Sequence, residues 1–232
     1  MKTLHILLFF ISSCFISQLS YSQDESPQDT IVVKNQYGLR AGLDLAKPLR
    51  SLLEDGYTGF EIVADFRLTK KLYIAGEIGN EEKDYLEANL NARTKGSYLK
   101  IGGDVNVYKN WLGVNNAVII GLRYGVASFS QELLAYNIYN TNQTFPPSFV
   151  VDPQEFNGLT AHWAEVMVGI KAELFNNLYL SLNLQLKHLV AEDRPENFDN
   201  LFIPGFNTTN DFSEFGVGYG YSISYLIPLF SK

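Results

Sequence analysis

Histidine is the residue type here best suited to acid–base chemistry, and beyond the first 22 residues the sequence has two, His162 and His188. A lipid deacylase would combine a histidine with a serine and an acid within hydrogen-bonding reach. Glu192 and Asp193 follow His188, but no serine and acid are placed around either histidine by a clear spacing. The two histidines also lack the i, i+4 spacing typical of a zinc site. We therefore predict no catalytic residue, no metal site and no cofactor.

A second set of chemically active side chains consists of acids and bases that recur at every second position of several segments. The acids are Asp44, Glu61, Asp65, Glu77, Asp104, Glu165 and Glu173. The bases are Arg40, Arg67, Lys100, Arg123, Lys171 and Lys187. If these side chains share one closed interior, they must pair, because an unpaired buried charge costs several kcal/mol. Since acids and bases nearly balance, we predict that they form a lumen charge network.

The segments that position these residues alternate apolar and polar side chains with a period of two, which is typical of β-strands. Eight segments carry this pattern: 37–45, 59–68, 72–79, 97–108, 117–129, 161–174, 178–188 and 215–227. The connections alternate in length, and the shortest are 69–71 and 175–177. Outer-membrane barrels have short periplasmic turns and longer extracellular loops. The sequence therefore predicts an all-β fold, an eight-stranded antiparallel up-and-down transmembrane β-barrel of the outer-membrane type.

Two kinds of barrel differ in whether their rows of apolar side chains point into the barrel or away from it. A soluble periplasmic barrel that carries an apolar ligand would turn its leucine and isoleucine rows inward. An outer-membrane barrel turns them toward lipid. The apolar rows are almost free of charge over whole strands, and the opposite rows are rich in glycine and serine, which fit a narrow interior. We therefore expect apolar rows outside, with Trp111 and Trp163 at the two membrane interfaces.

The first 22 residues resemble a Sec signal peptide, with Lys2, an apolar stretch and small residues before a cleavage site after Ser22. Cys14 lies in a weak lipoprotein-like context, so lipidation is an alternative. We expect residues 1–22 to be the signal peptide, 23–35 a flexible segment and 36–232 the barrel. With 18 Lys and Arg against 25 Asp and Glu, the net charge is −7, which argues against a nucleic-acid partner.

The long connections and the last strand carry further signals. Residues 132–158 and 189–214 are expected to be extracellular and contain several aromatic residues, which either bind a partner or pack over the barrel mouth. These aromatics are Tyr136, Tyr139, Phe145, Phe149, Phe156, Phe198, Phe202, Phe206 and Phe212. Gly220, Ile223 and Tyr225 partly match the C-terminal signal for the barrel assembly machinery. Pro228 has no N–H, so we expect strand pairing to end or bulge near Ile227.

Several stretches of the chain resemble a Bacteroidota family of small outer-membrane β-barrel proteins of unknown function. The stretches are YGLRAGLD (37–44), LYIAGEIGNEE (72–82), TKGSY (94–98), GLRYG (121–125), IYNTNQ (138–143) and IPGF (203–206). The resemblance extends over essentially the whole mature chain. It implies the barrel fold and assigns no activity.

The sequence therefore predicts a non-enzymatic protein in the outer membrane of a Gram-negative bacterium. It would be structural, or would bind a protein or glycan ligand through its extracellular loops. Its other partners would be outer-membrane lipid and, during biogenesis, the barrel assembly machinery. Two alternatives are a lipid-modifying enzyme at the barrel rim and a soluble periplasmic barrel that binds an apolar ligand.

Overall fold

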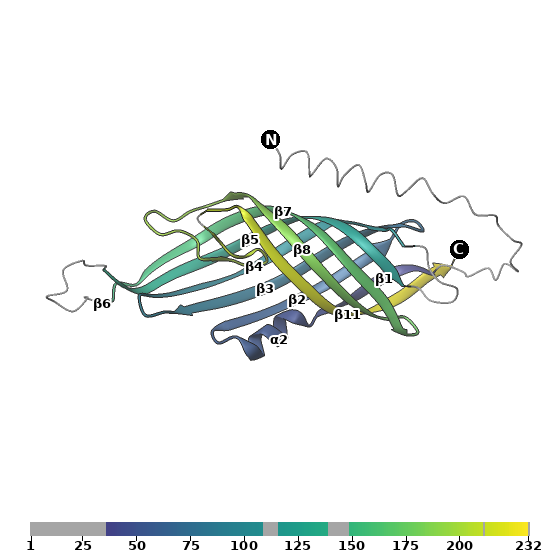
Figure 1. Ribbon diagram of the computed structural model, residues 1–232, viewed down its shortest axis with the longest axis horizontal. Helices are drawn as coiled ribbons and strands as arrows, with labels where there is room; N and C mark the ends of the chain where they lie inside the picture. The colour runs from purple at the N-terminus through teal and green to yellow at the C-terminus, as the bar shows by residue number, and fades with distance from the viewer. Residues whose placement is uncertain (1–35, 109–115, 139–148, 211, 232) are drawn as a thin grey trace, which may run out of the picture. The chain divides into compact units, whose positions relative to one another are not determined.

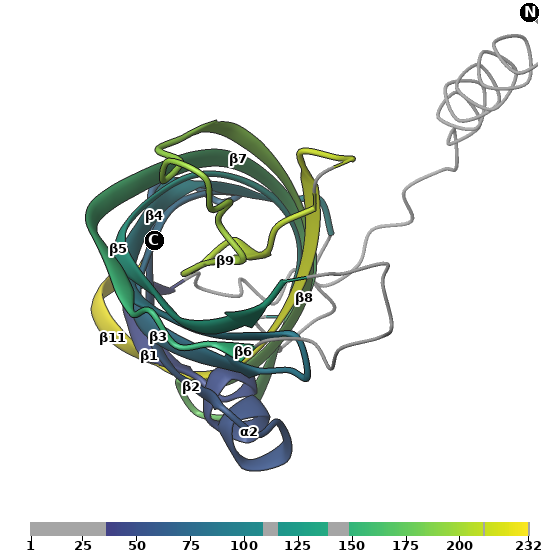
Figure 2. The ribbon, with the colours of Figure 1, turned by 90° about the vertical axis from the view of Figure 1, so that its left-hand side faces the viewer.

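The computed structural model describes residues 36–108, 116–138, 149–210 and 212–231. Residues 1–35, with Cys14, and Trp111 lie outside the described residues. Eight long antiparallel strands form a closed barrel (Figures 1 and 2). They are β1 (Gln36–Asp44), β2 (Tyr57–Arg67), β3 (Leu72–Leu86), β4 (Leu90–Asn106), β5 (Ala117–Asn137), β7 (Gln154–Phe175), β8 (Leu178–Glu192) and β11 (Phe215–Ser231). Each strand pairs with the next one along the chain in this set, and β11 pairs with β1 to close the barrel.

The predicted fold class and all eight predicted strands are confirmed, but four strands extend further at the end with long connections. β3 and β4 pair as far as Leu86 and Asn91, so most of the expected loop at 80–96 is strand. β5 and β7 likewise extend into the expected loop at 130–160. In these extensions both faces carry polar residues, so the apolar alternation on which the prediction relied is lost there.

The exterior of the barrel is apolar and its interior is polar and charged. Ile74, Val168 and Leu184 are 51%, 53% and 71% exposed on the outer face, whereas Asp104 and Glu165 are fully buried. The predicted direction of the rows is therefore confirmed, and the alternative barrel with leucine and isoleucine rows inside is wrong.

Trp163 is fully buried, so its predicted position at the membrane interface is wrong. It follows the inward parity of its neighbour Glu165 on β7. Its indole occupies the space left by Gly125, where a Cβ atom would lie 2.2 Å from the ring. The ring belongs to a lumen cluster with Tyr98, Phe129 and Phe206.

Short elements occur at the end of the barrel that carries the long connections. They are α2 (Ala46–Leu53), β6 (Phe149–Val150), β9 (Phe202–Ile203) and β10 (Asn207–Thr208). Helix α2 lies in a segment that we expected only to be a connection. Asp44 Oδ1 accepts a hydrogen bond from the Lys47 N–H (2.9 Å) in its first turn, where Pro48 is also tolerated. Within the described residues, no helix is long and apolar enough to cross a membrane.

The last strand bulges where Pro228 interrupts its hydrogen-bonding edge. Gly38 pairs with Pro228 and Tyr37 pairs with Phe230, which leaves one residue of β11 unpaired between them. Pairing then resumes, and the rings of Tyr37 and Phe230 stack with centroids 5.2 Å apart. The expected irregularity is confirmed in the form of a bulge.

Candidate functional site: the filled lumen and its plug

A continuous chain of ion pairs crosses the lumen. Arg40 Nη2 lies 2.8 Å from Asp65, and Lys171 Nζ lies 2.8 Å from Asp65 and 3.3 Å from Asp104. Arg123 then bridges Asp104 (2.7 Å) and Glu77 (3.2 Å). Lys100 bridges Glu77 and Glu61, with 3.2 Å to the latter. Each charge in this chain is flanked by charges of opposite sign, and the chain links strands β1, β2, β3, β4, β5 and β7.

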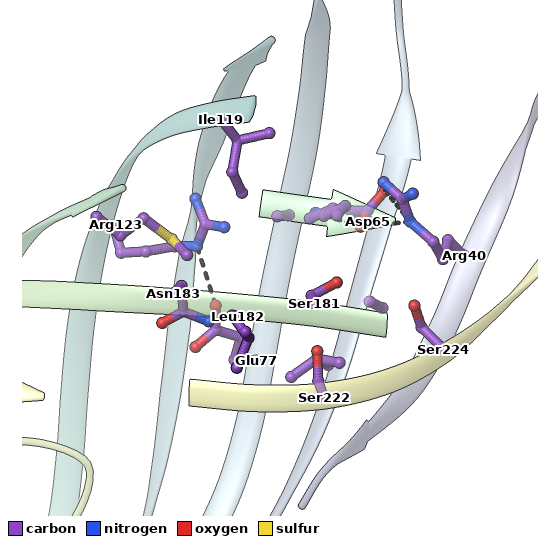
Figure 3. Close-up of a pocket in the computed structure, with 15 residues that line it drawn as sticks. Arg40, Asp65, Glu77, Ile119, Arg123, Ser181, Leu182, Asn183, Ser222 and Ser224 are labelled. Atoms are coloured by element: carbon purple, nitrogen blue, oxygen red, sulfur yellow. Dashed lines mark hydrogen bonds and ion pairs between the residues drawn. The ribbon is translucent and has the colours of Figure 1, made fainter. Parts of the chain in front are cut away.

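A small polar cavity lies beside the part of this chain that runs from Arg40 to Glu77 (Figure 3). Arg40 and Asp65 lie on one side of it and Glu77 and Arg123 on the other, with Ser222 of β11 between them. Its volume is about 40 Å³, which is room for roughly three water molecules at ~10–15 Å³ each. A cavity of this size holds solvent for the polar lining but no substrate-sized ligand.

Two further predicted lumen residues, Arg67 and Glu173, lie at the end with the short turns. Arg67 donates to the Lys70 carbonyl (2.9 Å), and its guanidinium lies over the rings of Tyr37 and Tyr73. Glu173 Oε1 accepts from the Asn177 N–H (3.1 Å) in the turn between β7 and β8. These two charged side chains therefore hydrogen-bond to the backbone of the short turns and stabilise the strand ends there.

The last three predicted lumen residues are Asp44, Glu165 and Lys187. Asp44 accepts backbone N–H groups of Lys47 and Tyr221 rather than pairing with a lumen cation. Glu165 and Lys187 face each other on β7 and β8. Lys187 Nζ donates to the carbonyls of Gly205 (2.7 Å) and Phe206 (3.4 Å), and among the described residues no carboxylate oxygen lies within 4 Å of it.

The connection between β8 and β11 folds into the mouth of the barrel as a plug, which we define as residues 199–209. Figure 2 shows β9 inside the ring of strands. Phe202, Ile203 and Phe206 of the plug are almost fully buried, and Phe206 packs edge-on against Trp163 with centroids 6.1 Å apart. Gln131 holds the plug to β5, because its side chain bonds the Asp199 carbonyl and the Leu201 N–H, both at 3.0 Å.

Glu81 is the main polar anchor of the plug, and the sequence analysis missed it. Its carboxylate is 1% exposed and accepts hydrogen bonds from Lys47 Nζ of α2, the Tyr57 hydroxyl of β2 and the Gly205 N–H of the plug. Glu81 has the same parity as Glu77, so continuing the alternation of β3 by one more pair would have found it. Lys47 gave no such signal, because it lies on a helix.

Of the two alternatives for the aromatic residues of the long connections, packing over the barrel mouth applies to some of them. Phe202 and Phe206 are buried, and Phe156 and Phe198 pack together with centroids 6.0 Å apart. Phe212, in contrast, is 97% exposed. Tyr139 and Phe145 lie outside the described residues.

The two histidines point outward near the rim on neighbouring strands. His162 Nδ1 lies 3.3 Å from the Tyr124 hydroxyl, and His188 Nε2 lies 3.8 Å from Glu214. Nearby, Thr160 donates its hydroxyl (2.6 Å) and N–H (3.0 Å) to Asp193, which lowers the pKa of that exposed carboxyl. Within the described part of the chain, neither imidazole is hydrogen-bonded to a serine hydroxyl, and no group of acids, histidines or cysteines is arranged for a metal.

These features define an eight-stranded barrel of the outer-membrane type with a charged, filled lumen and a plugged mouth. The chain belongs to a family described as a domain of unknown function, DUF6048, whose model matches residues 1–232. It is also similar to the crystal structure of Ail, the attachment invasion locus protein of Yersinia pestis, with 9% identity, a TM-score of 0.41, and coverage of 84% of this chain and 99% of that chain. No curated protein matches.

Proposed function

We propose that this protein is a non-enzymatic outer-membrane barrel of a Gram-negative bacterium, of the phylum Bacteroidota, that serves as a rigid scaffold for an extracellular surface. In this proposal it is exported by the Sec pathway and inserted by the barrel assembly machinery. The observation that carries the proposal is the filling of the lumen. Among the described residues, the cavities along the ion-pair chain from Arg40 to Glu61 have volumes of only about 40 Å³, too small for a pore or a substrate, since eight strands enclose only enough room for side chains. A larger cavity of about 330 Å³ lies at the mouth, lined by Phe206 and Thr209 of the plug and by Glu192 and Glu214, and it belongs to the extracellular surface rather than to a path through the barrel.

The surface at the plugged end supports the partner-binding part of the proposal. The extensions of β3, β4, β5 and β7 stand beyond the other strands, and exposed apolar side chains lie on these extensions and on the connections at the same end of the barrel. Leu86 is 73% exposed and Val151 is 71% exposed, and Phe212 of the neighbouring connection is almost fully exposed. Exposed apolar groups on a polar rim are typical of protein interaction sites. We propose a protein or glycan ligand here.

Localisation and closure can be tested together. We expect the full chain to fractionate with the outer membrane and to migrate differently on a gel when boiled and unboiled, because a closed barrel resists SDS. We also expect no conductance in a planar bilayer. A soluble periplasmic fraction without a mobility shift, or a steady conductance, would refute the proposal.

The absence of catalysis needs its own experiment, because the histidines at the rim are exposed to lipid headgroups. Lipid A from cells that carry His162→Ala and His188→Ala should have the same acylation and phosphorylation as lipid A from wild-type cells. A mass difference that returns when the histidines are restored would replace the scaffold with the lipid-modifying enzyme.

A further inference from the structure

The barrel wall is incomplete on one side. Strand β1 ends at Asp44, but its two neighbours continue outward, β2 as 57–61 and β11 as 215–221. Along these stretches β2 pairs only with β3, and β11 pairs only with β8. Helix α2 follows β1 directly and lies beside the outer end of β2 (Figure 1). A helix therefore takes the place of the missing half of a strand.

Side chains and loop atoms of this region make hydrogen bonds to some backbone groups of the two open edges. Asp44 accepts the Tyr221 N–H of β11 (3.0 Å), and the Leu45 N–H donates to the Tyr221 carbonyl (2.6 Å). Ser51 of α2 accepts the Gly59 N–H of β2 (3.0 Å). Unpaired backbone groups cost several kcal/mol in hydrocarbon. These bonds indicate that α2 is built into the wall.

The two faces of α2 suit this position. Its inward face carries Ala46, Lys47 and Arg50, with Arg50 bonded to Asn207 (3.1 Å) and stacked 4.0 Å over the Tyr57 ring. Its outward face carries the exposed side chains of Leu49, Leu52 and Leu53. This is the spacing of an amphipathic helix, but the apolar face points away from the protein. It continues the apolar exterior formed by Phe60 of β2 and Val217 of β11.

A second cavity of about 40 Å³ lies between α2 and β11. Gly218, which faces the lumen, and Tyr219, whose ring faces outward, both line it, so the cavity lies against the β11 backbone at the wall. Its other lining residues are Ala46, Lys47, Arg50, Glu61, Lys100, Gln185, Lys187 and Asn207. Four of these are cations and one is an acid, but Lys47, Arg50 and Lys100 each contact a carboxylate, so Lys187 is the cation best placed to attract an anion.

Lys187 is the cation of the lining that forms no ion pair within 4 Å among the described residues, although the buried carboxylate of Glu165 faces it across β7 and β8. Its side chain is 3% exposed, and within the described part of the chain its ammonium group donates hydrogen bonds only to the two carbonyls of the plug. The other three cations of the lining each contact a carboxylate: Lys47 contacts Glu81, Arg50 contacts Glu54, and Lys100 contacts Glu61 and Glu77. A buried charge without a counter-ion is costly, so an anion in this cavity would be stabilised.

We infer that the seam between α2 and β11 binds an anionic lipid of the outer leaflet, with a phosphate directed toward Lys187 and the acyl chains along the outer faces of Leu49 and Tyr219. The cavity has room for roughly three waters, which fits phosphate oxygens but no acyl chain. The continuity of the leucine face with the apolar exterior favours a lipid over a free anion. This inference rests on the proposed location in the outer membrane.

The position of α2 can be measured with spin labels in vesicles. The full chain with Cys14→Ser has no other cysteine, so a label can be placed at Leu52→Cys, with Leu184→Cys and Leu86→Cys as controls of similar exposure. We expect the labels at positions 52 and 184 to collide with oxygen and the label at 86 to collide with a nickel complex. A label in water at position 52 with a label in lipid at position 184 would overturn the inference about α2 but leave the proposed function standing. A label in water at 184 would overturn the proposed function.

Lipid binding can be measured by native mass spectrometry of the full chain in detergent. We expect bound lipid A in preference to phosphatidylcholine, and Lys187→Met should weaken this preference on the order of tenfold or more. Gly218→Val keeps every charged residue but fills the cavity, because its Cβ would lie 2.6 Å from Gln185 Oε1 and 3.0 Å from Lys187 Nζ, and it should have the same effect. The exposed Lys95→Met is the matched control.

Three results would overturn the inference. They are equal binding of the two lipids, equal loss of lipid A in Lys95→Met, and full displacement of lipid A by inorganic phosphate, which would assign the cavity to a soluble anion. The heat-dependent gel shift identifies variants that have not folded. If Lys187→Met does not fold, the preference of Gly218→Val for lipid A, compared with that of wild type, tests the inference instead.

Discussion

Substituting Lys100 with methionine should reveal how much the lumen network contributes to stability. Lys100 is 2% exposed and bridges Glu61 and Glu77. Without it, Glu77 retains Arg123, but Glu61 has no other cation within 4 Å among the described residues. Breaking a buried pair by removing one partner costs about 3–5 kcal/mol.

Protonation sets an upper limit on this cost. Glutamate in water has a pKa near 4.3, so neutralising such a carboxyl group costs about 3.7 kcal/mol at pH 7 and about 1 kcal/mol at pH 5. A variant whose buried carboxylate has lost its cation can avoid the cost of the unpaired charge by taking up a proton. The part of the loss of stability in Lys100→Met that comes from the unpaired carboxylate should therefore not exceed about 4 kcal/mol at pH 7, within the range of about 3–5 kcal/mol for the whole substitution, and it should shrink as the pH falls.

The assay is equilibrium unfolding by guanidinium in lipid vesicles, followed by the fluorescence of Trp163 in a Trp111→Phe background. Lys95→Met is the control, since Lys95 lies 3.4 Å from Glu132 in an exposed pair that should contribute about 0–1 kcal/mol. If Lys100→Met is no less stable than Lys95→Met at pH 7, or if its deficit does not depend on pH, the account of the network is wrong.

Three further predictions concern the plug and the lipid-facing surface. Gly205→Ala should destabilise the plug by about 1–3 kcal/mol, because Gly205 has φ +80° and a Cβ there would lie 2.6 Å from the Tyr98 ring. Acrylamide should then quench the fluorescence of Trp163 more strongly, and unchanged quenching would contradict this prediction. Glu81→Gln should loosen the same plug by weakening its bonds to Lys47 and Gly205, and the quenching of Trp163 should rise, whereas the rim variant Glu132→Gln should leave it unchanged. Leu184→Arg, on the lipid face, should cost about 2–4 kcal/mol in vesicle unfolding, and a cost near zero would argue against lipid contact.

The barrel and the side on which its charges lie could be predicted from the sequence, because lipid imposes a simple rule on every strand. The leucines of β8 alternate with polar residues without interruption from Leu178 to Leu186, so both the strand and its faces are evident. The same rule places Glu165 and Asp104 inside. The same rule also places Trp163 inside, because it shares the parity of Glu165; its predicted position at the membrane interface is wrong because that prediction follows the residue type and the expected strand end instead of the parity.

The plug and α2 could not be predicted, because their positions depend on contacts between distant parts of the chain. Gly205 reaches Glu81 across 124 residues, and Arg50 reaches Asn207 across 157. No local pattern encodes such pairs. The leucines of α2 were uninformative for a different reason, since their apolar face has no partner within the protein and the segment is only eight residues long.

The early end of β1 also affects how the barrel would open. β1 pairs with β2 only from Leu39 to Leu43 and with β11 from Gln36 to Asp44, the latter with a bulge, whereas β4 and β5 remain paired from Leu90 to Asn106. The strand that closes the ring is therefore held by the fewest hydrogen bonds. Amide exchange should be fastest along β1, and a force pulling the barrel apart would split it at this strand first.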